Sequence, residues 1–316
     1  MVTIETRAAD ALHRFALDES AKAAIAREPF LRALALRVAR RYLGGETLAE
    51  VLETVASVNR AGRPASVDFM GESARSAAVA NEATEEFCRL AAALERGGLQ
   101  ASLSFDLSHV GLVIDEELCL ANASRIAEAA AASGAALMVS MEGHDRVDAV
   151  LRLHERLCGR FDHVGVTLQA RLGRTDGDLA AALSRPGRIR LVKGAYVVPP
   201  AHALDRDDPA LAARFLALAR TLVASGHDGS LATHDPELVA ALAQEVPGGG
   251  PVEFEMLLGL GGALLDGLAE SGQATREYVV YGTEWFLYVI NRIAEQPDRV
   301  SQAIIDAIGD GNGALG

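Results

Sequence analysis

The sequence predicts an α/β fold, a (β/α)8 barrel of the TIM type preceded by an N-terminal helical segment. Short β-rich runs alternate with longer runs in which apolar residues recur at intervals of three and four. Eight such pairs follow one another, which is the number that a closed parallel barrel needs. A length of 316 residues, half of them hydrophobic, suits one large domain of this kind.

Residues 1–60 are predicted to form the N-terminal helical segment packed on the barrel, and residues 61–316 the barrel itself. Each expected strand is an apolar or alternating run bounded by Gly, Pro, Asp or Ser. The expected strands span residues 65–70, 101–107, 136–142, 163–169, 188–196, 229–234, 252–257 and 277–282. The clearest helices between them span residues 72–97, 115–132, 146–160 and 209–225.

An open doubly wound sheet would also alternate strands and helices. It would usually have fewer strands and a glycine-rich phosphate-binding turn after the first one. The segment after the first expected strand reads GESARS and lacks the G-x-G-x-x-G pattern. The barrel is therefore favoured over a Rossmann sheet.

Composition excludes several classes of protein. The 30 Lys and Arg residues against 43 Asp and Glu residues leave a formal charge of −13, which argues against a nucleic-acid-binding protein. Three cysteines lie far apart without a C-x-x-C pair, so we expect reduced thiols in a cytoplasmic protein. No apolar window is long enough for a membrane span or a signal peptide. Residues 32–41 form a basic amphipathic stretch that suits peripheral membrane contact, although an ordinary helix is favoured because its arginines do not segregate to one face.

Polar side chains stand where several expected strands end, most notably Gln169, Arg190, Lys193 and His234. In a (β/α)8 barrel these ends converge on one mouth, where the chemistry of the fold takes place. No pair of ligands has the spacing of a metal site, so a catalytic metal is not expected. Basic and amide side chains beside a glycine-containing loop suit a large anionic ligand that carries phosphates and a polar heterocycle.

Several motifs resemble those of the proline dehydrogenase family, which includes the dehydrogenase domain of proline utilisation A and short bacterial enzymes. They are RLVKGAY (190–196), LATHDP (231–236), VEFEMLLG (252–259) and YGTEWFLYVINRIAEQP (281–297), with weaker matches at 45–55, 67–72, 103–112 and 165–175. The resemblance covers nearly the whole chain and implies a barrel that binds FAD noncovalently across its mouth. It also implies hydride transfer from the carbon next to the substrate nitrogen to flavin N5.

The resemblance assigns roles residue by residue. The implied catalytic residues are Arg190, Ser140 and Tyr278. The implied flavin contacts are Met141, Gln169, Arg190, Lys193, Gly194, Ala195, Thr233 and His234. The implied substrate contacts are Asp106, Leu257, Tyr278, Tyr288, Asn291, Arg292 and Glu295.

The substrate end departs from the family pattern at three places. Asn291 and Arg292 stand where the family has two arginines, Asp106 where it has a lysine, and Ser140 where it has an aspartate. The usual four groups sum to a charge of +2, whereas these sum to zero, and a charged hydrogen bond contributes about 1.5–3 kcal/mol. An altered substrate is favoured, with the alternative that Asp106 pairs with Arg292 or points away. Glu295, one helical turn after Arg292, is expected to orient it.

These observations predict a FAD-dependent dehydrogenase of a proline-like amino acid or related amine, with altered specificity. One alternative is authentic L-proline dehydrogenase, which forms pyrroline-5-carboxylate and passes electrons to a quinone or another acceptor. A barrel that binds flavin without turnover is a further alternative, which the intact flavin-facing set disfavours.

Overall fold

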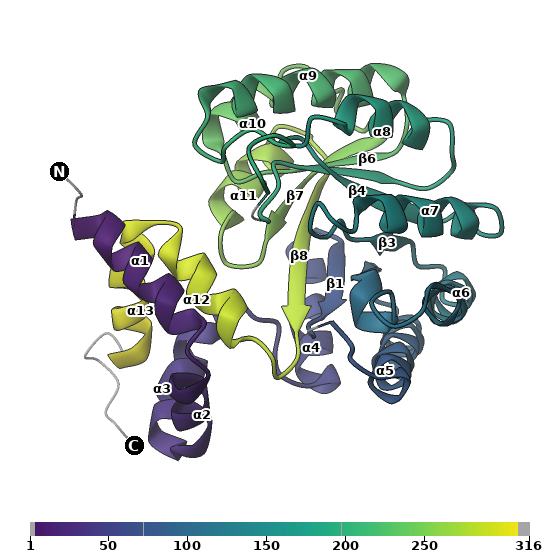
Figure 1. Cartoon of the computed structure of the whole chain (residues 1–316). Helices are drawn as coiled ribbons and strands as arrows, with labels where there is room; N and C mark the ends of the chain where they lie inside the picture. Colours follow the sequence, from purple (N-terminus) through teal and green to yellow (C-terminus); the bar gives the residue numbers. More distant parts are fainter. Residues whose placement is uncertain (1–3, 72, 197, 309–316) are drawn as a thin grey trace.

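The computed structural model describes residues 4–71, 73–196 and 198–308 and contains a closed barrel of parallel strands in the order β1 to β8 (Figure 1). The barrel closes by pairing of β8 with β1, with Ser66 opposite Tyr278. The predicted (β/α)8 barrel is confirmed. The strands are β1 (Ala65–Phe69), β2 (Ala101–Phe105), β3 (Leu137–Val139), β4 (Val164–Gln169), β5 (Ile189–Val192), β6 (Gly229–Ala232), β7 (Val252–Leu257) and β8 (Thr275–Tyr281).

A helix follows each strand, as the barrel requires. The predicted helix over 72–97 begins at Ala77, because the Ser76 hydroxyl accepts a hydrogen bond from the Val79 amide and caps the helix there. Residue 72 lies outside the described residues. The helices that follow β1 to β7 are α5 (Ala77–Arg96), α6 (Glu116–Ala132, after the 3-10 helix η1, Leu107–Val110), α7 (Val147–Cys158), α8 (Thr175–Ala182), α9 (Pro209–Ser225), α10 (Pro236–Ala243) and α11 (Gly262–Glu270).

The strand predicted over 188–196 is too long, because β5 ends at Val192. Gly194 has φ +108°, a backbone conformation that interrupts a strand and that side chains with a Cβ disfavour. Residues 193–196 consequently form a loop at the mouth of the barrel instead of continuing the sheet.

The main hydrophobic core lies between the strands and the surrounding helices rather than inside the barrel. Alternate strand residues such as Val67, Leu103 and Phe254 are fully buried in this outer layer. Their neighbours along the same strands point inward and are largely polar, with Ser66 on β1 bonded to Ser102 on the adjacent strand β2. The inner face therefore supplies polar groups, and its upper end becomes the functional site.

A second, smaller core joins the two ends of the described chain beside the barrel (Figure 1). There α1 (Ile4–Ala16) contacts α12 (Phe286–Ala294), and α3 (Pro29–Ala39) contacts α13 (Pro297–Ile308). Helix α2 (Glu19–Arg27) completes this group, which we call the helical lobe, whereas α4 (Leu48–Arg60) packs against β1 and β8. The segment expected over residues 1–60 is thus divided between the barrel and the lobe.

The basic stretch over residues 32–41 lies mainly in α3, and two of its arginines form ion pairs inside the lobe. Arg32 bonds to Glu46 at 2.6 Å, and Arg41 bonds to Asp306 at 2.6 Å. Among the described residues, no helix is both long enough and apolar enough to cross a membrane.

Candidate active site

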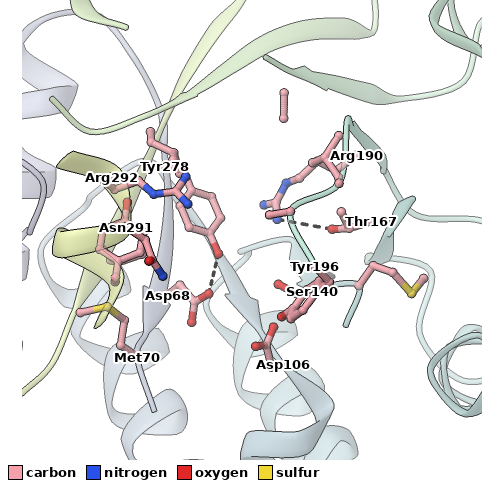
Figure 2. A pocket seen from close by; sticks show the side chains of 18 of the residues that line it. Asp68, Met70, Asp106, Ser140, Thr167, Arg190, Tyr196, Tyr278, Asn291 and Arg292 are labelled. Atoms are coloured by element: carbon pink, nitrogen blue, oxygen red, sulfur yellow. Dashed lines mark hydrogen bonds between the residues drawn. The ribbon is translucent and has the colours of Figure 1, made fainter. Parts of the chain in front are cut away.

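A cavity of about 620 Å³ opens at the carboxyl ends of the strands (Figure 2). This volume lies in the range of small-molecule sites. Its walls come from strand ends around the barrel, from the 193–196 loop and from α12. Fourteen of the residues predicted from the sequence line it: Asp106, Ser140, Met141, Gln169, Arg190, Lys193, Gly194, Ala195, His234, Leu257, Tyr278, Tyr288, Asn291 and Arg292.

Two predicted site residues do not line this cavity. Thr233 is buried, and its hydroxyl accepts a hydrogen bond from the Asp235 amide at 3.2 Å, which shapes the turn after β6. Glu295 lies beyond the wall and binds Arg292 at 2.7 Å, in the orienting position expected from the sequence. Asp235 caps α10 and binds Lys193 at 2.7 Å.

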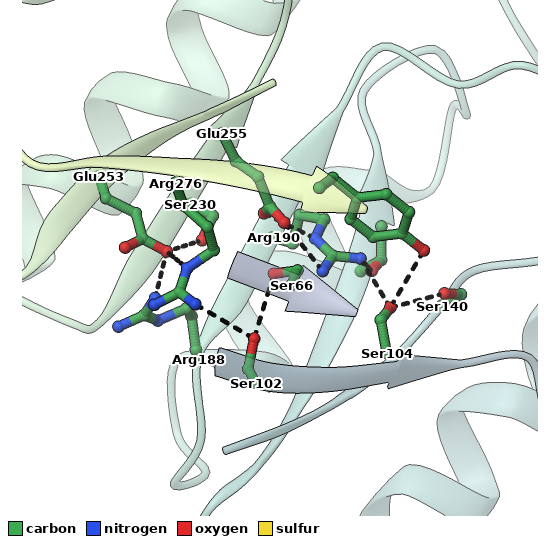
Figure 3. Close-up of polar contacts among 12 residues, drawn as sticks. Ser66, Ser102, Ser104, Ser140, Arg188, Arg190, Ser230, Glu253, Glu255 and Arg276 are labelled. Atoms are coloured by element: carbon green, nitrogen blue, oxygen red, sulfur yellow. Dashed lines mark hydrogen bonds and ion pairs between the residues drawn. The ribbon is translucent and has the colours of Figure 1, made fainter. Parts of the chain in front are cut away.

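Arg190 is the centre of the polar layer under the cavity (Figure 3). Its guanidinium donates to both carboxylate oxygens of Glu255, at 2.9 and 3.2 Å, and to the Ser104 hydroxyl at 3.1 Å. It also lies 4.8 Å from the ring centre of Tyr278. Burial alone would lower the pKa of Arg190, but the Glu255 carboxylate more than offsets this and raises it. Arg190 therefore stays charged while buried.

Tyr278 connects this polar layer to the wall of the cavity. Its hydroxyl donates to the Asp68 carboxyl at 2.5 Å and lies 3.3 Å from the Ser104 hydroxyl (Figures 2 and 3). Burial, followed by the charge of Asp106, raises the pKa of Asp68 well above its usual range. The protonated form of the Asp68 carboxyl is therefore favoured at the cavity floor.

Asp106 follows β2 and faces the cavity near Ser140 (Figure 2). Burial, followed by the nearby Glu142 carboxylate, raises the pKa of Asp106 to about 7. Within the described residues it forms no ion pair with Arg292, whose partner is Glu295. The alternative in which Asp106 neutralises Arg292 is therefore wrong.

The opposite wall of the cavity is positive. Glu295 binds Arg292 at 2.7 Å and also binds Arg299 at 2.9 Å, so two guanidinium groups share one carboxylate. Arg292 also lies 5.5 Å from the ring centre of Tyr288. Burial, followed by these two arginines, lowers the pKa of His234 to about 4, and its neutral Nε2 accepts the Leu257 amide at 2.9 Å.

The helical lobe reaches the rim of the cavity through two polar contacts. His13 Nδ1 lies 3.0 Å from the Asn291 amide oxygen, and Lys22 binds Glu284 at 2.9 Å. Because the Asn291 oxygen faces His13, its amide nitrogen is directed toward the cavity (Figure 2). Helices α1 and α2 thereby contribute to the surroundings of α12.

Deeper in the barrel, a second polar layer supports the first (Figure 3). Glu253 accepts from Arg276 at 2.6 Å, from Ser230 at 2.7 Å and from Arg188. This part of the barrel interior is therefore joined by hydrogen bonds and ion pairs among polar side chains.

Comparison with known proteins identifies the family of this chain. The family model for proline dehydrogenase matches residues 51–302. The chain belongs to the proline dehydrogenase family. Proline dehydrogenase 1 of Bacillus subtilis (strain 168) is 33% identical over 274 residues, which cover 85% of this chain and 90% of that protein. Proline dehydrogenase of Deinococcus radiodurans is 33% identical over 269 residues, covering 82% and 86%.

Solved structures show the same fold. Proline utilization A (PutA) of Bdellovibrio bacteriovorus, inactivated by N-propargylglycine, matches with a TM-score of 0.80 at 16% identity. The match covers 98% of this chain and 39% of the PutA chain. As a member of the proline dehydrogenase family, the chain is a flavin-dependent oxidoreductase of the type that acts on CH–NH groups.

The cavity fits the flavin that this family implies. Gln169 donates its Nε2 to the Glu142 carbonyl at 2.8 Å, but its buried Oε1 has no partner among the described residues. Tyr288 Oη and Arg292 Nε are also buried without partners, and all three residues line this cavity. Unsatisfied buried polar atoms require a ligand or water. At Gly194, a Cβ would come within 2.8 Å of Gln169 Oε1, so glycine leaves the backbone open.

Sequence reasoning missed groups that act through contacts across the barrel. Asp68 lies inside a quoted motif and alternates inward with Ser66, a signal that could have identified it. Glu255 lies inside the motif VEFEMLLG, but its bond to Arg190 spans 65 positions of sequence, so no local pattern reveals it. His13 and Lys22 gave no local signal at all, because their role depends on how the lobe meets α12.

Removal of the Arg190 side chain tests what this ion pair does. Arg190→Ala is expected to lower the free energy of unfolding by about 3–5 kcal/mol, because Glu255 remains buried and uncompensated. The double variant Arg190→Met with Glu255→Leu removes both charges and is expected to recover most of that stability. Urea unfolding gives the stability, and anaerobic rapid mixing with an amine gives the rate of flavin reduction.

If the double variant is stable but its flavin is reduced at least 100-fold more slowly than that of the wild-type protein, Arg190 has a role in the chemistry. Flavin reduction that returns together with stability would contradict that role and leave Arg190 a purely structural residue.

Proposed function

We propose that this chain is a FAD-dependent dehydrogenase that oxidises the carbon–nitrogen bond of a proline-like amino acid or related amine. The observation that carries the proposal is one cavity that is lined by residues of both the flavin-facing set and the substrate-facing set of the family. A ligand-binding barrel without turnover is disfavoured, because Arg190, Tyr278 and Asp68 form a fully connected polar network at that cavity.

The residues that would hold FAD lie around the β4 to β6 ends. Gln169 offers an amide, Lys193 a cation and Gly194 an open backbone, with Met141, Ala195 and His234 beside them. Thr233 would act indirectly, through the turn that places His234 and Asp235. FAD supplies the hydride acceptor when it is bound. The residues of the chain bind and orient the two partners and exclude water between them.

The substrate would lie against α12 and β8. Arg292, oriented by Glu295, would bind a substrate carboxylate, while Tyr278, Tyr288 and Leu257 would enclose the carbon skeleton. Asp106, Ser140 and Asn291 make this end of the cavity less positive than the family pattern. On that ground we propose altered specificity, in which the substrate donates to Asp106 a hydrogen bond that the family lysine could not accept.

Two further elements belong to the same proposal. Electrons would leave to a quinone or another small acceptor, as the family resemblance implies. The reduced state expected for Cys88, Cys119 and Cys158, which form no disulfide here, supports a cytoplasmic location. The second candidate function, or runner-up, is authentic L-proline dehydrogenase. It would use the same flavin site but would turn over L-proline efficiently.

Two glycine-to-alanine substitutions, one in the flavin site and one outside it, test where FAD binds. Gly194→Ala places a Cβ against Gln169 Oε1 and Arg171, so we expect FAD affinity to fall at least tenfold. Gly226→Ala is the control, because Gly226 also has a positive φ, +71°, but a Cβ there meets nothing within 4 Å. Bound FAD is measured by fluorescence titration of the stripped protein. Equal affinity of the two variants would place the flavin elsewhere, and a wild-type protein that takes up no FAD would refute the proposed function.

Specificity is tested by anaerobic reduction of the flavin with L-proline and with a set of cyclic and N-substituted amino acids. We expect slow reduction by L-proline and faster reduction by a substrate with an additional hydrogen-bond donor. Restoring the family charges with Asp106→Lys, Ser140→Asp and Asn291→Arg together is expected to raise proline turnover at least tenfold and to lower turnover of the preferred substrate, because Ser140→Asp supplies a carboxylate in place of the one that Asp106→Lys removes. Single replacements are expected to do less, since neighbouring groups do not act additively.

Efficient oxidation of L-proline by the unmodified protein would refute altered specificity and establish the runner-up. The FAD titration above is unaffected by that outcome.

A further inference from the structure

The cations around the cavity are already paired. Each of the four cationic side chains in the wall contacts a carboxylate at 2.9 Å or less. The pairs are Lys22–Glu284, Arg190–Glu255, Lys193–Asp235 and Arg292–Glu295. Burial lowers the pKa of both His109 and His234 to about 4, so neither imidazole adds charge at neutral pH.

Two carboxyl groups in the same wall have no cationic partner within the described residues. They are Asp68 and Asp106, which we call the carboxyl pair. Burial raises the pKa of both carboxyls, and the charge of Asp106 raises the pKa of Asp68 further. With Asp68 protonated and Asp106 ionised, the two carboxyls together carry one negative charge. The cavity is therefore complementary to one cation, and on its substrate side the buried Tyr288 Oη has no partner among the described residues.

The surroundings distinguish the two members of the pair. Asp68 is held by the Tyr278 hydroxyl at 2.5 Å. Asp106 caps η1 without any side-chain bond to that helix, so its carboxyl is available to a ligand. It also lines a second cavity of about 750 Å³, which shares Gly71 and Tyr196 with the first.

The groups that face Asp106 come from each neighbouring element. Glu142 after β3 is the nearest like charge, and it is itself bound to Arg146 at 2.8 Å. A hydrogen bond with Ser140 and the charges of Arg146 and Arg190 favour the ionised form of Asp106, and Asp106 in turn raises the pKa of Asp68 on β1. Tyr196 stays un-ionised because burial raises its pKa, and His109, on the same turn, is neutral.

We propose that the carboxyl pair binds the ammonium group of the substrate and that the Asp106 carboxylate takes its proton. This rests on the proposed function and defines its substrate class as secondary amines that arrive as cations. The N–H bond breaks, its proton passes to an Asp106 oxygen, and the bonding electrons remain on nitrogen as a lone pair. When FAD is bound and supplies the hydride acceptor, that lone pair would form the C=N bond as the adjacent carbon loses its hydride. The nitrogen must lose its proton first, because an ammonium has no lone pair to give.

The test uses the FAD-loaded protein, with L-proline and pyrrolidine as probes of a secondary ammonium with and without a carboxylate. Wild-type flavin reduction is expected to rise with pH through an inflection near 7, because Asp106 must be ionised to accept the proton. Asp106→Asn is expected to be about 100-fold slower or more at pH 7, with no inflection there. Its deficit is expected to shrink at high pH, where the amine enters already deprotonated.

Two control variants separate this role from general damage. Asp106→Glu keeps a carboxylate and is expected to restore the inflection. Asp162→Asn removes an exposed carboxylate near the opposite end of the barrel, before β4, and is expected to keep the wild-type profile. A wild-type pH profile in Asp106→Asn, with its flavin still reduced, would overturn the inference and leave the proposed function intact.

Failure of the proposed function has a different signature. If neither probe nor any other amine reduces the flavin, calorimetric titration of the loaded protein with pyrrolidine hydrochloride still examines the carboxyl pair. Binding at least tenfold weaker in Asp106→Asn would support the ammonium site, and equal binding in the two proteins would overturn it.

Discussion

The bond between Arg190 and Glu255 is the constraint on which the mouth of this barrel depends. It joins β5 to β7 inside the barrel, with both side chains almost fully buried. Neither charge is tolerable there without the other, because a buried ion is stable only when it is paired and hydrogen-bonded. Arg190 also contacts the Ser104 hydroxyl and the Tyr278 ring. The Tyr278 hydroxyl in turn donates to the Asp68 carboxyl. A salt bridge in the interior thus fixes a carboxyl at the surface of the cavity.

The three positions at which we propose a changed substrate end lie outside that constraint. Asp106 and Asn291 belong to the turn after β2 and to α12, not to the ion-paired layer. Ser140 touches the layer only through a hydroxyl contact of 3.2 Å to Ser104. Family members can therefore keep the barrel and the flavin side while the charge of the substrate side changes. The fold and the substrate are determined by different residues. Membership of a family therefore predicts the fold more reliably than it predicts the substrate.

Much of the fold was predictable because its signals are local. Alternation along segments such as 101–107 and the apolar spacing along 115–132 each lie within one element, and the polar strand ends mark the mouth directly. What the sequence did not contain is pairing between distant elements. The partner of Arg190, the contact of His13 with Asn291 and the division of residues 1–60 between barrel and lobe all depend on contacts made after the elements form. The early end of β5 was a local error, since Gly194 already disfavours a strand at that position.

The helical lobe imposes an order on biosynthesis. His13 and Asn291 are 278 positions apart, and Arg41 and Asp306 are 265 apart, so both contacts wait for the last described helices to be made. Most barrel strands pair with the next strand along the chain, and those pairings are open to a nascent polypeptide much earlier. Until α12 and α13 are made, α1 and α3 contact α2 but lack the helices that cover their remaining apolar faces, which are then exposed to the solvent or to chaperones. An interrupted translation product would thus have a nearly complete sheet, an unfinished closure between β1 and β8, and no guanidinium at position 292 to receive a carboxylate.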